Sequence, residues 1–203
     1  MRRIVCFLLI LTILLSASGC GRVEQSDDVS TNNSVVSNTE VDIDFSSVIQ
    51  VEKQGYIPIS TDSIKSILEN TGRFEISEFP HMYDSYVDVI CELDKVDENS
   101  IASIFFTSAD DNTAKMISYN FSKDALQGGD EASIRWGLEV LMKILGDELT
   151  DDIWNDILSI AEKNESVGAF GTDYEGYSNP DTGIKLIYAD LGGNVQIDIK
   201  AIK

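Results

Sequence analysis

The alternation of hydrophobic and polar residues between about residue 73 and residue 121 predicts a series of strands. One example is YVDVICEL, residues 86–93. Its polar residues Asp88 and Glu92 are expected on one face of the strand. Its apolar residues are expected on the other face, and these are Val87, Val89, Cys91 and Leu93. Further strands are expected over 73–79, 101–108 and 114–121. Short polar turns separate these runs, and such turns favour antiparallel neighbours.

Three other segments show a helical period of nearly four. Residues 61–72 begin with Thr61, which can cap a helix, and end at Gly72. In 130–146 one apolar stripe runs along the helix, formed by Ile134, Leu138, Leu141 and Leu145. Residues 149–164 follow with Thr150 as a cap. We expect the last two helices to form a helical hairpin.

The C-terminal part is expected to hold a loop, residues 171–183, and then a β-hairpin over 184–200. Gly192 and Gly193 supply the turn, since glycine adopts the positive φ that tight hairpin turns need. Strands grouped apart from helices predict an α+β fold: an antiparallel sheet with helices, including the helical hairpin, packed on one face.

The N-terminus has the pattern of a secretion signal. Met1, Arg2 and Arg3 precede an apolar run, residues 4–15, and small residues 16–19 lead to Cys20. A membrane-spanning helix needs about 20 apolar residues, and this run is much shorter. We therefore expect a signal peptide and not a stable span.

The stretch ASGC, residues 17–20, resembles the lipobox of bacterial lipoproteins. The resemblance implies cleavage before Cys20 and attachment of diacylglycerol to its thiol, so that the protein is held on the extracytoplasmic face of the cell membrane. Two buried acyl chains anchor a protein firmly, whereas one holds it marginally. Secretion without a lipid is the alternative.

These signals predict three parts of the chain. Residues 1–19 form the signal peptide, 20–44 a lipidated tether, and 45–203 a single α+β globular domain. The tether sequence holds no aromatic residue and shows no sustained periodicity. Its small apolar area is insufficient to offset the entropy cost of folding, so we expect it to be disordered.

The charge of the chain limits its partners. The formal net charge is −20, and removal of residues 1–19 would take away Arg2 and Arg3 and no acid, giving −22. DNA, RNA and anionic head groups are bound by clusters of Lys and Arg. We therefore expect no nucleic-acid partner. We also expect the anionic surface of the membrane to repel the globular domain.

Side chains for catalysis or metal binding are scarce. His81 is the single histidine, and Cys91 would be the one thiol left after processing and lipidation. Protein zinc sites normally use several His and Cys side chains, and no nucleophile or phosphate-loop motif occurs. We therefore expect no catalytic residue, no metal and no cofactor. His81 is expected on a solvent-facing loop near Glu78 and Asp84, and Cys91 is expected to be buried and unreactive.

The expected loop, residues 172–183, is the best sequence candidate for a contact surface. It combines tyrosines with acidic residues, and we select Asp173, Tyr174, Glu175 and Tyr177 as candidate partner-binding residues. Tyrosine buries area while its hydroxyl keeps a hydrogen bond, which suits an adaptable surface. The alternative is that the tyrosines fold back over the sheet.

Three functions remain open at this stage. The first is a non-catalytic, lipid-anchored domain that binds an envelope protein or other envelope partner. The second is a lipoprotein that binds a cation or small ligand for a transporter, suggested by the acidic composition. The third is an envelope hydrolase with two carboxylates, which would have to converge across a cleft.

Overall fold

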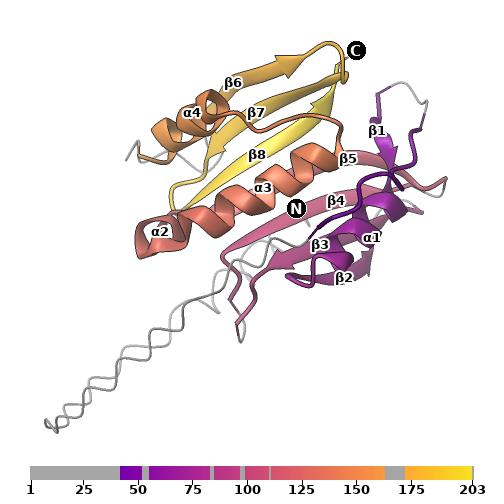
Figure 1. Ribbon diagram of the computed structural model, residues 1–203, viewed down its shortest axis with the longest axis horizontal. Coiled ribbons are helices and arrows are strands. Elements are labelled where there is room, and N and C mark those ends of the chain that lie inside the picture. Colours follow the sequence, from indigo (N-terminus) through magenta and orange to yellow (C-terminus); the bar gives the residue numbers. More distant parts are fainter. Residues whose placement is uncertain are drawn as a thin grey trace, which may run out of the picture. The chain divides into compact units, whose positions relative to one another are not determined.

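The computed structural model of the protein describes residues 42–51, 55–82, 85–96, 99–109, 111–162 and 172–202. The chain from Glu40 to Lys203 forms one compact unit. Cys20, the expected signal peptide and nearly all of the expected tether lie outside the described residues. The elements in chain order (Figure 1) are β1 (Ile57–Ser60), α1 (Thr61–Asn70), β2 (Phe74–Pro80), β3 (Val87–Leu93), β4 (Ala102–Ser108), β5 (Thr113–Ser122), α2 (Lys123–Ala125), the wide turn η1 (Leu126–Asp130), α3 (Glu131–Ile144), α4 (Asp151–Ala161), β6 (Thr172–Asn179), β7 (Ile184–Asp190) and β8 (Asn194–Ala201).

The strands form one antiparallel sheet in the order β2-β3-β4-β5-β8-β7-β6, and β1 adds a short pairing with β5. Two meanders, β2 to β5 and β6 to β8, are joined by the pairing of β5 with β8. The segments α2, α3 and α4 connect the two meanders along the chain. The predicted α+β fold with an antiparallel sheet is therefore confirmed.

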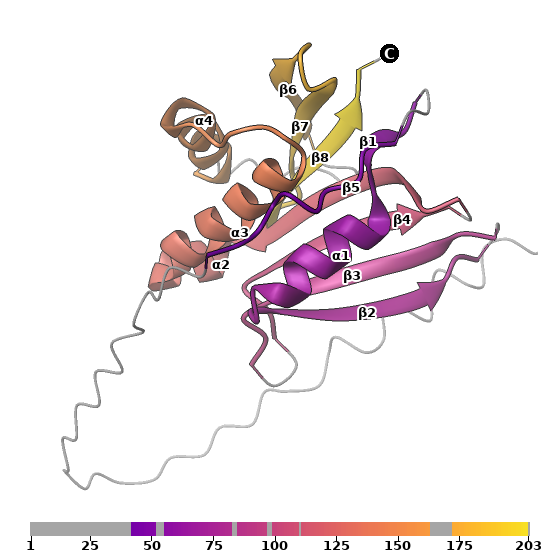
Figure 2. The ribbon, with the colours of Figure 1, turned by 45° about the vertical axis from the view of Figure 1, so that its right-hand side comes forward.

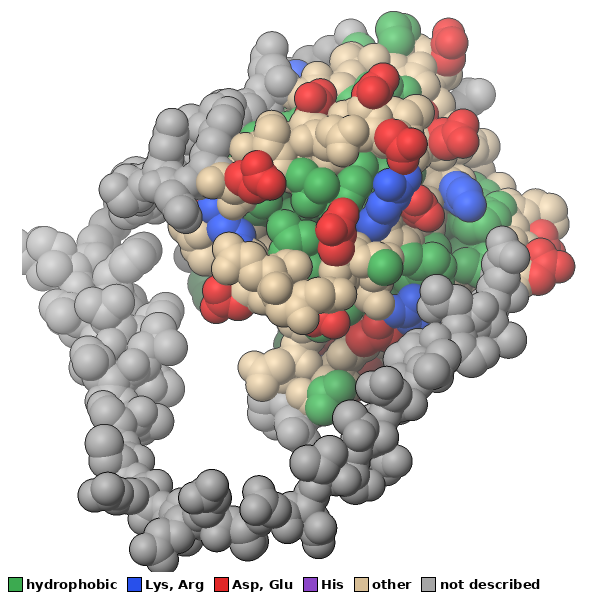
Figure 3. Space-filling model, turned by 60° about the vertical axis from the view of Figure 1, so that its left-hand side comes forward, with side chains coloured by type: hydrophobic (Ala, Val, Ile, Leu, Met, Phe, Trp, Pro, Cys, Tyr) green, Lys and Arg blue, Asp and Glu red, His purple; other side chains and the backbone are tan. Residues whose placement is uncertain are grey.

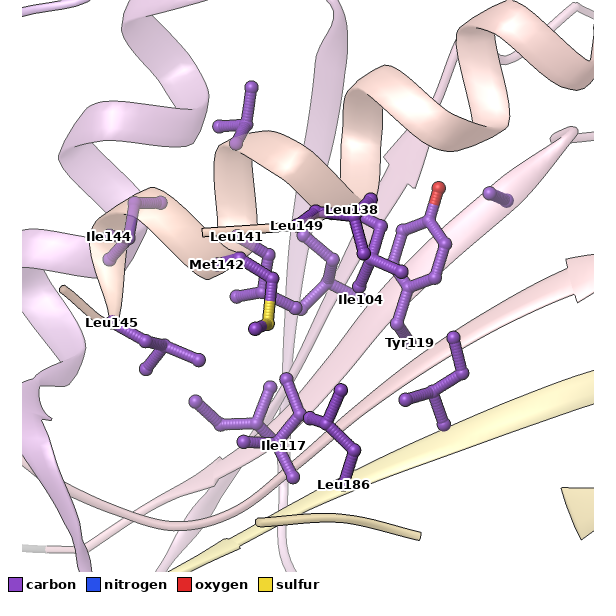
Figure 4. Close-up of a cluster of buried hydrophobic side chains, with 14 of the residues drawn as sticks. Ile104, Ile117, Tyr119, Leu138, Leu141, Met142, Ile144, Leu145, Leu149 and Leu186 are labelled. Atoms are coloured by element: carbon purple, nitrogen blue, oxygen red, sulfur yellow. The ribbon is translucent and has the colours of Figure 1, made fainter. Parts of the chain in front are cut away.

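Helices α1, α3 and α4 cover one face of this sheet (Figure 2). Alternate strand residues point to them and form a continuous core with the apolar faces of the helices. Figure 4 shows α3 at the centre of this core, where Leu138 and Leu141 lie over Ile104 and Ile117 of the sheet. No helix in the described part of the chain is long and apolar enough to cross a membrane.

The expected helical hairpin is not confirmed. Helix α3 lies beside α1, whereas α4 packs against β6, β7 and β8. Side-chain bonds still connect α3 with α4: Arg135 Nη2 lies 2.6 Å from Asp151 Oδ1, and Trp154 Nε1 donates to Glu131 Oε1 at 3.1 Å. The second meander offers α4 its own apolar surface, so the helix packs there.

Two further sequence predictions need correction. Ser60 and not Thr61 caps α1, because Ser60 Oγ accepts the backbone N–H of Ser63 at 3.1 Å. Residues 172–179, expected within a loop, form the edge strand β6, which pairs with β7. Its sequence is mostly polar and contains Gly176, so it lacks the period-two alternation of apolar residues that predicted the other strands.

Gly137 allows α3 to approach the sheet closely. A Cβ atom at this position would lie 2.7 Å from Tyr119 Oη and 2.8 Å from Leu93 Cδ2. The Tyr119 hydroxyl is fully buried and donates to the backbone oxygen of Ile134 in α3 at 2.6 Å. A larger residue at position 137 would therefore push the helix away from this bond.

We predict that Gly137→Ala destabilises the protein although alanine favours helices. Helix propensity alone would contribute about 1 kcal/mol of stability, but overpacking of a core typically costs about 1–3 kcal/mol. The free energy of unfolding, measured by urea denaturation, should fall by up to about 2 kcal/mol. Gly128→Ala is the matched control, because no atom lies within 4 Å of its added Cβ. Equal stability of the two variants would refute the close contact.

A buried ion pair fixes the end of β5 to the β7–β8 turn. Lys123 Nζ lies 2.8 Å from Asp190 Oδ1, and both side chains are almost fully buried. The same carboxylate oxygen accepts the backbone N–H of Gly192 at 2.8 Å, and the backbone N–H of Lys123 donates to Gly193 at 3.0 Å. The β7–β8 turn is therefore held against the start of α2.

Removal of one member of this pair should be costly. Lys123→Met would leave the Asp190 carboxylate buried without its cation, which typically costs about 3–5 kcal/mol. Asp190→Leu introduced beside Lys123→Met should restore part of that loss, because no uncompensated charge then remains. Urea unfolding of the single and double variants measures both effects. A single variant as stable as the unmodified protein would contradict this account.

Candidate functional site

A groove of about 740 Å³ lies on the helix-free side of the sheet. We call it the lysine groove, and it is lined by Gly55, His81, Tyr86, Thr107, Lys115, Met116, Ser178, Lys185, Ile187, Lys200, Ala201 and Ile202. In β7 and β8, Leu186 and Ile199 are buried under the helices. Their neighbours Lys185 and Lys200 point the other way, because successive strand residues alternate between the faces.

Strand register brings the polar residues of the groove into one row across the sheet. Ser178 of β6 pairs with Lys185 of β7, which pairs with Lys200 of β8. Ile199 pairs with Ile117, so the next positions of those strands, Lys200 and Met116, are also neighbours. The row therefore joins three strands of the second meander to β5 of the first.

Lys185 and Lys200 stand directly opposite each other on this face. Opposed side chains in an antiparallel pair have Cβ atoms about 4.5–5.5 Å apart, and like charges there are destabilising. A sequence with many more acids than bases has ample means to avoid such a pair. The register therefore brings two cationic side chains to neighbouring positions, and the carboxylate of Asp198, 3.7 Å from Lys200 Nζ, offsets part of their repulsion.

A β-bulge brings a third lysine to the same side. Thr107 pairs with Met116 and Ser108 with Ala114, which leaves Lys115 as the extra residue of β5. Lys115 and Met116 are consecutive, yet both are exposed and line the groove. Lys115 Nζ lies 4.9 Å from the centre of the Tyr86 ring, within the range of a cation–π interaction.

These lysines differ from most cations of the domain. Five others pair with carboxylates within 4.0 Å, namely Lys65, Arg73, Lys95, Lys123 and Arg135. Among the described residues, Lys115, Lys143 and Lys185 have no such partner, and Lys200 Nζ lies 3.7 Å from Asp198 Oδ2. Of these four lysines, which are unpaired or paired only at a long distance, three line the groove.

The two carboxylates nearest the groove bond to neighbouring side chains of the sheet. Asp198 Oδ1 accepts from Ser118 Oγ and from Gln196 Nε2, each at 2.7 Å. Asp88 accepts from Thr107 Oγ1 at 3.1 Å. Neither carboxylate lines the groove itself. Among the described residues, the charged groups that line the groove are therefore cationic.

His81 lies outside the strands and helices, as the sequence suggested, but its side chain is only partly exposed to solvent. Its side chain is 31% exposed, and Nδ1 lies 2.9 and 3.0 Å from the two oxygens of Asp88. Of its expected neighbours, Glu78 instead pairs with Lys65, and Asp84 lies outside the described residues. Because the carboxylate accepts a hydrogen bond, it favours a proton on Nδ1 and orients the ring at the groove.

This histidine does not complete a nucleophilic relay with the described residues. In such a relay the hydroxyl bonds to the imidazole nitrogen opposite the carboxylate. Here Thr107 Oγ1 donates to Asp88 Oδ1 and not to the imidazole. The arrangement orients an imidazole at a binding surface.

Other sequence candidates for chemistry lie away from the groove. Cys91 is buried, as predicted, and burial raises the pKa of its thiol to about 12. The thiol therefore stays protonated near neutral pH, and a protonated thiol is a poor nucleophile. Within the described ranges no three His, Cys, Asp or Glu side chains are grouped as a metal site.

In the segment selected as a partner-binding loop, the side chain of Tyr177 is bonded within the domain. Tyr177 Oη donates to Asp147 Oδ1 at 3.0 Å, and partial burial together with this acceptor raises the pKa of Tyr177. Asn179 and Thr182 also donate to Asp147, at 3.0 and 3.1 Å. The other three candidates are Asp173, Tyr174 and Glu175, and the structure describes their backbone but not their side chains.

The groove itself was missed by sequence reasoning. Ser178, Lys185 and Lys200 each occupy an ordinary polar position of a strand, and strand register makes them neighbours. One signal was the predicted Gly192–Gly193 turn, because a two-residue turn there places Lys185 opposite Lys200. A second signal was present at Lys115, which falls on the apolar side of the alternation through Ile117 and Tyr119. A lysine at such a position indicates a β-bulge.

The groove contrasts with the acidic surface elsewhere. Acidic, basic and hydrophobic side chains are all present on the face drawn in Figure 3, and the acidic ones are spread over it. Comparisons with protein-family models, with curated proteins and with solved structures find no match to this chain.

Proposed function

We propose that this protein is a lipid-anchored, extracytoplasmic domain that binds an envelope partner without catalysis, and that the lysine groove is its binding site. The observation that carries the proposal is the convergence of Lys115, Lys185 and Lys200 on the helix-free face of the sheet. The core needs only the other face, where all three helices pack. The groove residues are therefore available for a ligand.

Binding suits the chemistry of the groove better than hydrolysis does. Two-carboxylate hydrolysis requires two acids that converge on one substrate bond. The described lining of the groove holds no acid, and instead supplies ammonium and hydroxyl groups beside apolar side chains. Such groups hold and orient a partner through hydrogen bonds and burial of apolar area.

The proposed anchor rests on the N-terminal sequence. A diacylglycerol on Cys20 would hold the protein at the membrane, and residues 20–44 would connect it to the domain. Flexible chains of 24 residues reach about 25–30 Å. The domain would therefore meet partners close to the bilayer surface.

Photo-crosslinking in bacterial cells tests this function. A photoreactive phenylalanine in place of Ser178, on the exposed edge of the groove, should capture a specific neighbour in the full-length, lipidated protein. The same residue in place of Asn155, an exposed polar position on α4, should capture that neighbour at least severalfold less. The adducts are identified by mass spectrometry.

Two further observations complete this test. The N-terminal peptide of the mature protein should carry a diacylglycerol mass at Cys20, and Cys20→Ala should lose both the lipid and the specific adduct. Equal capture from positions 178 and 155, or no specific capture from position 178, would refute the groove as the binding site. A mature peptide without lipid would refute the anchor.

A further inference from the structure

The lysine groove combines positive charge with apolar surface. Met116 and Ile202 are each 37% exposed, and together with Ile187 they form its apolar part. Lys115, Lys185 and Lys200 lie among these side chains, with the His81 imidazole on the same surface. A ligand that satisfies both kinds of surface must carry an anionic group and an apolar body.

The opposed lysine pair indicates where the anionic group would lie. Lys185 and Lys200 face each other across β7 and β8, so an anion between them would remove their repulsion and accept a charge-assisted hydrogen bond from each. Ser178 pairs with Lys185 from the other side and adds a hydroxyl donor to the row. The groove thus presents three donors in a row from three adjacent strands.

We propose that the groove binds a single-chain amphipathic anion, with a carboxylate or phosphate head group between Lys185 and Lys200 and an apolar chain along Met116, Ile187 and Ile202. This inference rests on the proposed binding function and names its ligand class. The groove volume of about 740 Å³ lies within the range of about 300–1,000 Å³ found for small-molecule sites.

The acidic surface of the protein determines which anions can reach the groove. A net charge of −20 repels extended polyanions such as nucleic acids and anionic bilayers. At physiological ionic strength, exposed charges are screened beyond about 8 Å, so a small ligand inside the groove interacts mainly with the local lysines. The groove therefore favours a small, singly headed anion.

Calorimetric titration of the mature chain, residues 20–203 with Cys20→Ser, tests the ligand class. This chain keeps the whole compact unit with its core. Decanoate and decyl phosphate are the two anionic probes, and they distinguish a carboxylate from a phosphate head group. Decyltrimethylammonium has the same apolar chain with opposite charge, and inorganic phosphate provides the head group alone.

At least one anionic probe should bind the mature chain, and added salt should weaken that binding. Decyltrimethylammonium should not bind, and inorganic phosphate should bind much more weakly than decyl phosphate. Lys185→Gln and Lys200→Gln should each weaken the anionic probe by about tenfold. Ile187→Ser should weaken decyl phosphate while leaving inorganic phosphate unchanged.

Lys143→Gln is the matched control, because Lys143 also lacks a carboxylate partner among the described residues but lies on α3, at the helix-covered side. It should bind the probes as the unmodified chain does. Lys185→Gln should also keep or raise the thermal unfolding midpoint without ligand, because it removes a like-charge pair. That result would separate a binding role from a structural one.

Several outcomes would overturn this inference: equal binding of decanoate and decyltrimethylammonium, no binding of either anionic probe, or full affinity in the Lys185→Gln/Lys200→Gln double variant. If no anionic probe binds but the photoreactive residue at position 178 captures a protein in cells, the ligand class is wrong and the proposed binding function stands. If position 178 also captures nothing, both proposals fail.

Discussion

The close packing of α3 on the inner face of the sheet is the contact on which the architecture depends. Gly137 allows the backbone of the helix to come within reach of the Tyr119 hydroxyl, which donates to the Ile134 carbonyl. Around this contact the apolar residues of both meanders form one core with α1, α3 and α4. Because all three helices lie on the same face, the opposite face of the sheet keeps its polar side chains and its groove.

The groove is a product of pairing between distant strands. Pairing of β5 with β8 joins the two meanders, and the register of β7 with β8 places Lys185 opposite Lys200. The buried pair of Lys123 with Asp190 holds the end of β5 beside the β7–β8 turn, at the other end of the same strands. Structural stability and the proposed binding surface are thus connected through the same three strands, although their charged residues lie apart.

The net charge of this protein and the local charge of its groove point to partners of opposite charge. The excess of acids argues against anionic partners when the chain is treated as a whole. Most described cations are neutralised by acids on neighbouring elements, as Arg73 is by Asp94. The groove lysines are the main exception among the described residues, so the charge of the proposed binding surface differs in sign from the net charge of the molecule.

The sequence by itself determined the α+β class and most strands and helices, because period-two and period-four apolar patterns reflect which side of each element is buried. It did not reveal β6, whose polar residues follow no such pattern, nor the separate packing of α3 and α4. The sequence also implied the opposition of Lys185 and Lys200, because the predicted Gly192–Gly193 turn sets the register of that hairpin. The tertiary structure decided that Lys115 and the His81–Asp88 pair reach the same groove as these two lysines, because the pairing of β5 with β8 joins strands distant in the sequence and no local turn sets its register.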